Sequence, residues 1–376
     1  MKPPIRLLAL GFSLVLVASA CGGDDEGEEA TPFFDEPIEM DLSEPERGPN
    51  DEPATPISEV EELTSDEIQT ISEGNYTAAL LWAGAGEWYN ALGGGAEAAF
   101  EDLGIEIVAR ADAQFDPAKQ ATDVESAMAQ DPDIILTLIV DPVSGAAAFQ
   151  PAVDAGTVLV LADNGAEGYQ AGEEYVALVT GDHFGMGQAA AELMNDALEG
   201  DGEVGMIFHD ADFFVTNNRD NSFRATIEQR FQDITIVDAK GFTEEGATFE
   251  TASAMISQHP EIDGIYVAWD VAAEGVVEAI RTAGREDDIA VVTHDLGVNN
   301  AVAMAQGEIV YGTVADLPFD IGRTMGMLAG HGLLDKEAPP FIVGEFIKVR
   351  RDDLPTAWEQ SLNQPLPPVV QQALEG

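Results

Sequence analysis

Short apolar runs alternate with amphipathic stretches along the chain from about residue 77 onward. The runs at 77–83, 134–140 and 158–162 are apolar at nearly every position, whereas the stretches between them place apolar residues at helical spacing. Continuously apolar strands between amphipathic helices are typical of parallel sheets that helices cover on both faces. The pattern predicts strands at 77–83, 105–109, 134–140, 158–162, 175–180, 204–208, 234–239, 265–268, 289–293 and 310–314, and helices at 91–103, 117–130, 145–155, 185–198, 221–230, 248–258, 273–283 and 299–306.

The alternation starts again after about Gly181, where a second series of strands and helices follows a complete first one. Two such series predict an α/β protein with two doubly wound, parallel-sheet lobes. A TIM barrel, in which all the strands would close into one sheet, is the rival architecture.

The first 21 residues have the pattern of a secretory signal. Lys2 and Arg6 precede the apolar run 7–17, and Ala18-Ser19-Ala20-Cys21 follows it. The run is too short to span a bilayer permanently, so we expect residues 1–20 to be a cleaved signal peptide. Ala-Ser-Ala before Cys21 resembles a bacterial lipobox, although that pattern usually has Leu where Ala18 stands. The resemblance implies lipidation of Cys21 and an extracytoplasmic protein anchored to the cell membrane, at the cell surface or in the periplasm; an ordinary signal peptide with an incidental cysteine is the alternative.

Residues 22–74 differ in composition from the rest of the chain. This segment contains 19 Asp and Glu against one Arg, with six prolines between Pro32 and Pro56. Such a segment buries too little apolar area to offset its ordering entropy, so residues 21–74 are expected to form a lipidated cysteine and a disordered acidic tether. A short helix at 58–71 is the one element that apolar spacing suggests there. Deleting residues 22–74 is then expected to change ligand affinity by less than about threefold.

Composition excludes several classes of function. The formal net charge is −54, and so negative a surface repels phosphate backbones, which excludes nucleic acid as the partner. A single cysteine excludes an internal disulfide and a cysteine-rich zinc site. The five histidines are too far apart in sequence for a local metal motif. We therefore expect no metal site and no cofactor.

Aromatic and acidic residues follow the predicted strands. In open parallel sheets, ligands bind beyond the carboxyl ends of the strands, so residues there are candidates for a binding site. Aromatic faces and carboxylates together suit a neutral, polyhydroxylated ring. Packing between the lobes is the alternative role for each Trp, and capping of a helix is the alternative for each Asp. The candidates at these positions are Trp82, Trp88, Tyr89, Asp141, Asp163, Asn164, Trp269, Asp270, Asp295 and Asp316.

From Tyr76 to about Arg351 the chain resembles the type I periplasmic sugar-binding proteins, such as the ribose and related receptors of ABC importers. The resemblance is carried in order by the stretches GEWYN (86–90), DPAKQ (116–120), PDII (132–135), LADN (161–164), NNRDNSF (217–223), HPEIDGI (259–265), THD (293–295) and DLPFDIG (316–322). The resembling stretch, residues 76–351, is over 70% of the chain.

The resemblance implies a set of ligand contacts. The paired aromatics of the family correspond to Trp88 and Tyr89, and its strand-end aspartates to Asp163 and Asp295. Two arginines of the ribose receptor correspond to Asn164 and Asn217, while a neighbouring arginine is kept as Arg219. An asparagine is replaced by Trp269, before Asp270, and a glutamine by Asp316. These departures imply a less cationic and more aromatic pocket, which argues against ribose and favours another pentose, a polyol or a small cyclic or branched sugar.

The resemblance also implies how the chain is divided and how it works. Residues 75–181 and 317–346 would form an N-terminal lobe and residues 182–316 and 347–376 a C-terminal lobe, joined by crossovers near 180–182, 315–317 and 346–348. The lobes would close on the ligand without a chemical step, and a membrane permease would receive the ligand from a monomeric receptor. A receptor for a furanosyl autoinducer or for a chemotaxis partner is the alternative within this fold, and a secreted enzyme is the alternative outside it.

Overall fold

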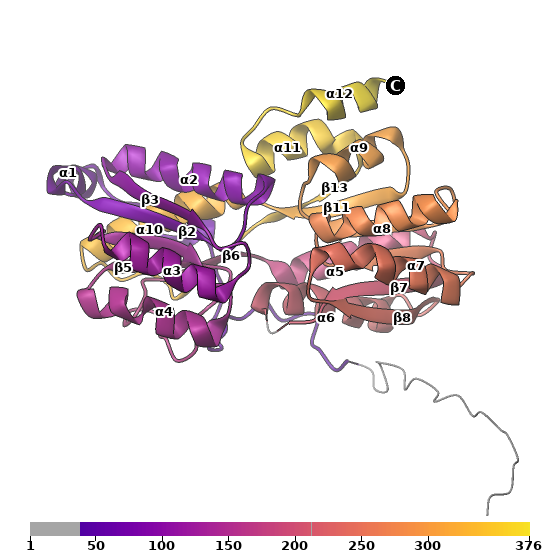
Figure 1. The fold of residues 1–376 in the computed structure, drawn as a ribbon, viewed down its shortest axis with the longest axis horizontal. Helices are drawn as coiled ribbons and strands as arrows, with labels where there is room; N and C mark the ends of the chain where they lie inside the picture. Colours follow the sequence, from indigo (N-terminus) through magenta and orange to yellow (C-terminus); the bar gives the residue numbers. More distant parts are fainter. Residues whose placement is uncertain (1–37, 212) are drawn as a thin grey trace, which may run out of the picture. The chain divides into compact units, whose positions relative to one another are not determined.

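The computed structural model describes residues 38–211 and 213–376, which form two α/β lobes around two separate sheets (Figure 1). The predicted signal peptide, Cys21 and residues 22–37 lie outside the described residues. Both sheets are open, so the TIM-barrel alternative is wrong and the doubly wound architecture is confirmed. The first sheet has the order β1 (Thr55–Pro56), β12 (Phe341–Gly344), β6 (Leu178–Gly181), β5 (Val158–Ala162), β4 (Ile134–Leu138), β2 (Thr77–Trp82) and β3 (Glu106–Asp112).

The second sheet repeats the plan of the first. Its order is β13 (Phe346–Val349), β11 (Val310–Asp316), β10 (Ala290–His294), β9 (Gly264–Val267), β7 (Gly202–His209) and β8 (Ile234–Phe242). Neighbouring strands are parallel in both sheets except at β13, which pairs antiparallel with β11. The carboxyl ends of the parallel strands therefore meet at one edge of each sheet.

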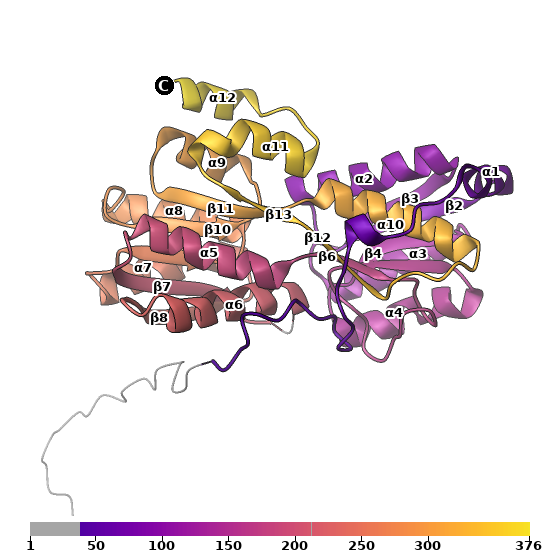
Figure 2. The ribbon, with the colours of Figure 1, turned by 180° about the vertical axis from the view of Figure 1, so that it is seen from behind.

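Helices cover both faces of each sheet (Figures 1 and 2). The helices of the first lobe are α1 (Ser65–Gly74), α2 (Glu87–Leu103), α3 (Pro117–Met128), α4 (Pro142–Ala155) and α10 (Pro318–Leu333). Those of the second are α5 (His183–Ala197), α6 (Phe214–Arg230), α7 (Thr248–Gln258), α8 (Asp270–Ala283), α9 (Val298–Gln306), α11 (Leu354–Leu362) and α12 (Pro368–Glu375). Single turns of 3-10 helix lie at η1 (Ile57–Glu59), η2 (Glu245–Ala247) and η3 (Arg351–Asp353).

Local sequence signals set many of the helix ends. At the start of α4, the carboxylate of Asp141 accepts a hydrogen bond from the backbone N–H of Ser144, and Pro142 supplies a suitable first residue. The same helix ends at Gly156, whose φ of 79° closes the helix in the left-handed conformation that glycine tolerates best. Helix α6 begins at Phe214, seven residues before the predicted start at residue 221, so its first two turns reach toward the other lobe.

The chain crosses between the two sheets three times. It leaves the first sheet after Gly181, returns after Asp316, and leaves it again between Gly344 and Phe346. The first and third crossings touch, because the backbone N–H of Asp182 donates to the carbonyl of Gly344 at 3.2 Å. These crossings form the hinge between the lobes.

The prediction of a disordered tether is wrong for residues 38–74. Strand β1 pairs parallel with β12, and helix α1 buries Ile71 completely in the first-lobe core. The predicted helix at 58–71 is instead the turn η1 followed by α1, which begins after a capping box of Thr64 and Glu67. The segment is acidic, but it docks on lobes that supply most of the apolar surface, so it needs few apolar residues of its own.

None of the helices in the described ranges 38–211 and 213–376 has the length and apolar character needed to cross a bilayer.

Helices α2 and α10 cross in close contact where glycines face the opposing backbone. A Cβ built on Gly95 would lie 1.9 Å from the carbonyl oxygen of Phe319, and one on Gly322 would lie 1.9 Å from that of Leu92. The next residue of α2, Gly94, would place its Cβ in ordinary contact with the Phe319 ring, at 3.9 Å. Gly95 and Gly322 are therefore required by the crossing, as is Gly326, whose added Cβ would lie 2.5 Å from that of Ala99 on α2.

We expect Gly95→Ala and Gly94→Ala to change stability in opposite directions. An alanine at 95 must push two backbones apart, which costs about 1–3 kcal/mol and lowers Tm by several degrees. An alanine at 94 meets no such contact and gains up to about 1 kcal/mol of helix propensity. Thermal unfolding followed by circular dichroism measures both changes, and equal Tm values for the two variants would contradict the packing of this crossing.

Candidate functional site

A cavity of about 120 Å³ lies between the lobes, at the carboxyl ends of strands from both sheets. The lobes are in contact beside it, because Phe213 and Val215 of the second lobe pack into the core cluster of the first. The cavity is therefore enclosed by both halves of the chain. Its lining residues are Ala85, Gly86, Glu87, Trp88, Tyr89, Phe115, Leu138, Asp163, His209, Phe213, Val215, Thr216, Arg219, Glu245, Trp269, Asp270, Val271 and Asp295.

Asp163 and Asp295 occupy equivalent positions in the two lobes. Each directly follows a central strand, β5 or β10, and each has a left-handed backbone, with φ of 58° and 66°. The N–H of Asp163 still bonds to Val179 of the neighbouring strand, and that of Asp295 to Val314. After this last hydrogen bond to the neighbouring strand, the backbone of each aspartate adopts the left-handed conformation, which Asp tolerates better than most residues do. Each lobe thus contributes one aspartate with this strand-end geometry to the cavity.

Arg219 on α6 connects these two aspartates. Its guanidinium donates two hydrogen bonds to Asp295, at 2.9 and 3.0 Å, and lies 4.0 Å from a carboxylate oxygen of Asp316. Burial by itself would lower the pKa of Arg219, but Asp295 and Asp316 outweigh it and raise that pKa. Arg219 is therefore a fixed cation, and it is the only Lys or Arg among the described residues that line the cavity.

His183 completes the connection to the first lobe. Its Nδ1 accepts a hydrogen bond from Nε of Arg219 at 3.1 Å, so the ring proton must be on Nε2, which faces Asp163 at 3.4 Å. Burial, and then the positive charge of Arg219, lower the pKa of His183, which keeps the ring neutral. Asp163 also accepts a hydrogen bond from the hydroxyl of Thr180 at 2.8 Å. One hydrogen-bonded chain therefore joins Asp163, His183, Arg219 and Asp295.

Aromatic rings from both lobes form the walls of the cavity. In the first lobe, Trp88 and Tyr89 meet edge to face with centroids 5.0 Å apart. In the second, the rings of Trp269 and His209 meet in the same way at 5.0 Å. Carboxylates fix both indoles, because Trp88 donates to Asp316 at 2.9 Å and Trp269 to Glu245 at 2.6 Å. These two hydrogen bonds fix the orientation of the indole rings.

Asp270 adds a different kind of acidic group, in the first turn of α8. Burial, followed by the nearby charge of Asp295, raises the pKa of Asp270 to about 8. A carboxyl group with that pKa carries a proton at pH 7, so it can donate one hydrogen bond and accept others. The cavity therefore holds both hydrogen-bond donors and acceptors suited to hydroxyl groups.

Seven of the sequence candidates line this cavity, and five do not. Those that line it are Trp88, Tyr89, Asp163, Arg219, Trp269, Asp270 and Asp295. Among the others, Asp141 caps α4, Trp82 belongs to the first-lobe core, and Asn164 donates to the carbonyl of Ile139 at 3.0 Å. Asn217 lies on α6 outside the lining, and Asp316 lies behind Trp88 and Arg219.

For Asp141 the physical reason is the local backbone conformation. A strand-end residue reaches the cavity only if the backbone turns it that way, as it does at Asp163 and Asp295; Asp141 instead has φ of −139° and serves its own helix. Three further residues at or after the carboxyl ends of strands also line the cavity, although they are not among the sequence candidates. Phe115 follows β3, His209 ends β7, and Glu245 follows β8, and all three line the cavity. His294, next to Asp295, is buried beneath the site and bonds to Tyr266.

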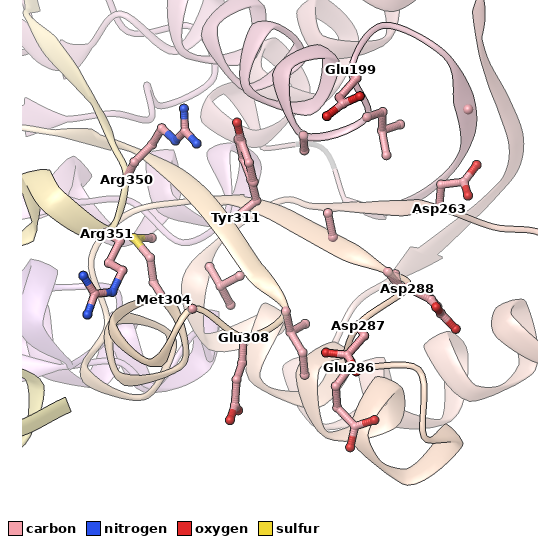
Figure 3. Close-up of a pocket in the computed structure, with 18 of the residues that line it drawn as sticks. Glu199, Asp263, Glu286, Asp287, Asp288, Met304, Glu308, Tyr311, Arg350 and Arg351 are labelled. Carbon is pink, nitrogen blue, oxygen red and sulfur yellow. The ribbon is translucent and has the colours of Figure 1, made fainter. Parts of the chain in front are cut away.

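A more open depression of about 1050 Å³ lies at the opposite edge of the second sheet (Figure 3). It is bounded by the amino ends of β7, β9, β10 and β11, and Glu199, Asp263, Asp287 and Glu308 are among its acidic residues. The Arg350 guanidinium lies 4.3 Å from the Tyr311 ring centroid. Ligands of open parallel sheets bind at the carboxyl edge, so the smaller cavity between the lobes is the better candidate. Within the described residues, no group of three or more His, Cys, Asp or Glu could hold a metal ion.

Comparison with known proteins agrees with this geometry. The ribose import binding protein of Bacillus subtilis is 29% identical over 229 residues, which cover 61% of this chain and 72% of that protein. A solute-binding protein of Agrobacterium vitis, solved with α-D-tagatopyranose, matches with a TM-score of 0.71 at 20% identity and covers 77% of this chain and 100% of its own. One from Bacillus halodurans, solved with myo-inositol, has a TM-score of 0.64 at 18% identity and covers 74% and 96%.

At these identities the solved structures establish the fold only. The family follows from a sequence model described as a periplasmic binding protein domain, which matches residues 78–337 and so includes strands of both sheets and the first two crossings between the lobes. The chain therefore belongs to the family of periplasmic binding protein domains.

Proposed function

We propose that this protein is a solute-binding lipoprotein of an ABC importer, which captures a sugar or polyol between its lobes and delivers it to a membrane permease. The observation that carries the proposal is the pair of aspartates, Asp163 and Asp295, that the two lobes bring to one enclosed aromatic cavity. The names of the relatives point the same way, because they describe ribose import and proteins bound to tagatose and myo-inositol.

The cavity suits a small polyhydroxylated ring. Two carboxylates accept hydroxyl hydrogen bonds, Arg219 donates, and Trp88, Tyr89 and Trp269 offer apolar faces to C–H groups. Its volume, about 120 Å³, is below the roughly 300–1,000 Å³ of pockets for drug-sized ligands, which favours a single ring over an oligosaccharide. Ribose itself is disfavoured, since Asn164 replaces an arginine of the ribose receptors and its amide is bonded within the first lobe.

Capture follows from hinge bending without a chemical step. Opening would separate the lobes about the crossings after Gly181, Asp316 and Gly344 and expose the cavity. Closing around a ligand removes water and pairs each hydroxyl. A sugar of the wrong configuration would leave a buried polar group unpaired, which costs about 1–3 kcal/mol. Specificity therefore depends on the closed form, which is also the form that a permease would recognise.

The membrane anchor is a separate part of the proposal. Cys21 follows an apolar run and small residues in the way that a lipidated cysteine does. Acylation there would hold the receptor at the outer side of the membrane, near its permease, at the cell surface or in the periplasm.

A thermal-shift screen should identify the ligand class. We expect at least one of D-ribose, D-allose, D-tagatose, D-arabinose and myo-inositol to raise Tm, because a ligand at 100 times its Kd stabilises the folded state by about 2.7 kcal/mol. Ribose is expected to give a smaller shift than the best member of the panel. Failure of every sugar and polyol in a wider panel would contradict the proposed function.

Asp163→Asn and Asp295→Asn should each weaken binding of the sugar so identified by roughly ten- to hundredfold. Each change removes a charge-assisted hydrogen bond worth about 1.5–3 kcal/mol, and 1.4 kcal/mol corresponds to a factor of ten in Kd. Isothermal titration calorimetry measures the loss. Asp141→Asn is the matched control, since Asp141 also follows a strand but caps α4 outside the cavity, and its Kd should stay at the wild-type value. Equal effects of all three substitutions would place the binding site elsewhere.

Cys21→Ser should release the protein from the membrane. A serine cannot be acylated through a thiol, so the variant is expected in the aqueous phase of a detergent partition and the unchanged protein in the detergent phase. Detection of the variant in the detergent phase would show that acylation of Cys21 is not the anchor.

A further inference from the structure

Residues 38–56, hereafter the strap, run from the second lobe to the first, with turns at 42–44 and 49–51 and a short antiparallel bridge between Arg47 and Pro53. Figure 2 shows this indigo segment passing from beside α6 toward the first lobe, and β1 at its end joins the first sheet. No function described above uses the strap. Its contacts nevertheless lie on both lobes and at the hinge between them.

The strap is attached to the second lobe by side chains of α5 and α6. The backbone N–H of Ile38 donates to the carboxylate of Glu228 at 3.0 Å. Gln229 donates to the carbonyl of Met40 at 3.0 Å, and both Arg230 and Gln188 donate to that of Leu42 at 3.3 Å. Most of these hydrogen bonds are accepted by backbone carbonyls of the strap. They therefore fix the position of its backbone and do not depend on the identity of its side chains.

The other end of the strap is attached to the first lobe. The side chain of Asn50 donates to the carbonyl of Tyr169 at 3.2 Å, and Thr55 and Pro56 pair with Ile342 and Val343 of β12. Because β12 leads directly into the third crossing, this end is fixed beside the hinge. The strap thus bridges the two lobes in addition to the three crossings.

Glu46, in the middle of the strap, is buried at the hinge with 5% of its surface exposed. One carboxylate oxygen accepts the backbone N–H of His183 at 3.0 Å, and the other accepts the side-chain amide of Asn218 at 2.9 Å. Burial, and then the charge of Asp182, raise the pKa of Glu46 well above its usual range. Burying a carboxyl group is costly, and these two hydrogen bonds offset part of that cost.

His183 links Glu46 to the ligand cavity. The imidazole of His183 contacts Asp163 of the first lobe and Arg219 of the second, and Arg219 holds Asp295. Glu46 therefore bonds to the backbone of the residue that contacts Asp163 directly and Asp295 through Arg219. The strap is therefore connected to the cavity through the side chain of Glu46 and one intervening residue, His183.

We propose that Glu46 is a positioning residue, and that the strap it belongs to favours the closed arrangement of the lobes and so sets the affinity of the cavity. Hinge opening would move α5 and α6 away from β12 and break strap contacts on one lobe or the other. The apparent Kd of a receptor equals its intrinsic Kd divided by the fraction of molecules that are competent to bind. A strap that holds the lobes closed thus raises affinity without touching the ligand. This inference rests on the proposed function only in assuming that the closed lobes hold the ligand.

The test measures the lobes without any ligand. In the full-length chain with Cys21→Ser, Glu101→Cys on α2 and Glu278→Cys on α8 place spin labels at exposed sites of the first and second lobes. Pulsed electron paramagnetic resonance then gives the distribution of distances between the lobes. Glu46→Ala is expected to raise the ratio of longer to shorter distances by about tenfold, since it removes two buried hydrogen bonds. The ratio should be unchanged in Glu44→Ala, which removes the same type of side chain from an exposed position of the strap.

A second variant tests the proposal independently, in case Glu46→Ala does not fold. Gln229→Ala with Arg230→Ala removes donors to the strap from the solvent-facing end of α6, far in sequence from the hinge, and should shift the same ratio in the same direction by a smaller factor. Unchanged distances in both this variant and a folded Glu46→Ala would overturn the proposal. Because no sugar is present, that result would leave the proposed function intact, whereas shifted distances in a protein that binds no sugar would refute the function alone.

Discussion

The buried guanidinium of Arg219 is the interaction on which the arrangement of the lobes depends. The chain has 70 acidic and 16 basic residues, and the cavity between its lobes draws carboxylates from both sides. Arg219 offsets this charge by pairing with Asp295 and approaching Asp316, while His183 extends the contact to Asp163. Removing one partner of such a buried pair costs about 3–5 kcal/mol, because it leaves an uncompensated buried charge, so Arg219 holds Asp295 in place and orients the site.

The parallel sheets explain why a site forms at this place. Every strand that ends at the carboxyl edge delivers the next residue to the same side, and three crossings turn the edges of the two lobes toward each other. Two left-handed aspartates then give the site its near symmetry, one from each lobe. The aromatic walls break that symmetry, since Trp88 and Tyr89 differ from Trp269 and His209 in size and polarity. A ring with unlike faces fits such a cavity better than a symmetric ion does.

The carboxyl groups of the protein differ in their role according to whether they are exposed or enclosed. Most carboxylates are exposed and keep the surface hydrated, whereas Glu46, Asp270 and Asp316 are enclosed and have raised pKa values. Each of these three contacts a hinge or cavity residue rather than the interior of one lobe. The strap has few apolar residues, but it is ordered because its backbone forms hydrogen bonds with side chains of the second lobe. Examples are the carbonyls of Met40 and Leu42, which accept from Gln229 and Arg230.

The sequence by itself determined the two-lobed α/β architecture and the edge at which the site lies, because apolar strands such as 134–138 and 158–162 are local patterns that burial on both faces requires. It also selected Asp163 and Asp295, which the structure places in the lining of the cavity, since position after a strand is a local property. It could not distinguish these from Asp141, which differs in backbone rotation, and it did not indicate that Glu245, which follows β8, lines the cavity. The sequence also did not predict that residues 38–74 adopt an ordered structure packed on the lobes. Those outcomes depend on partners far apart in the chain, such as Glu46 with His183, and only the tertiary structure brings such partners together.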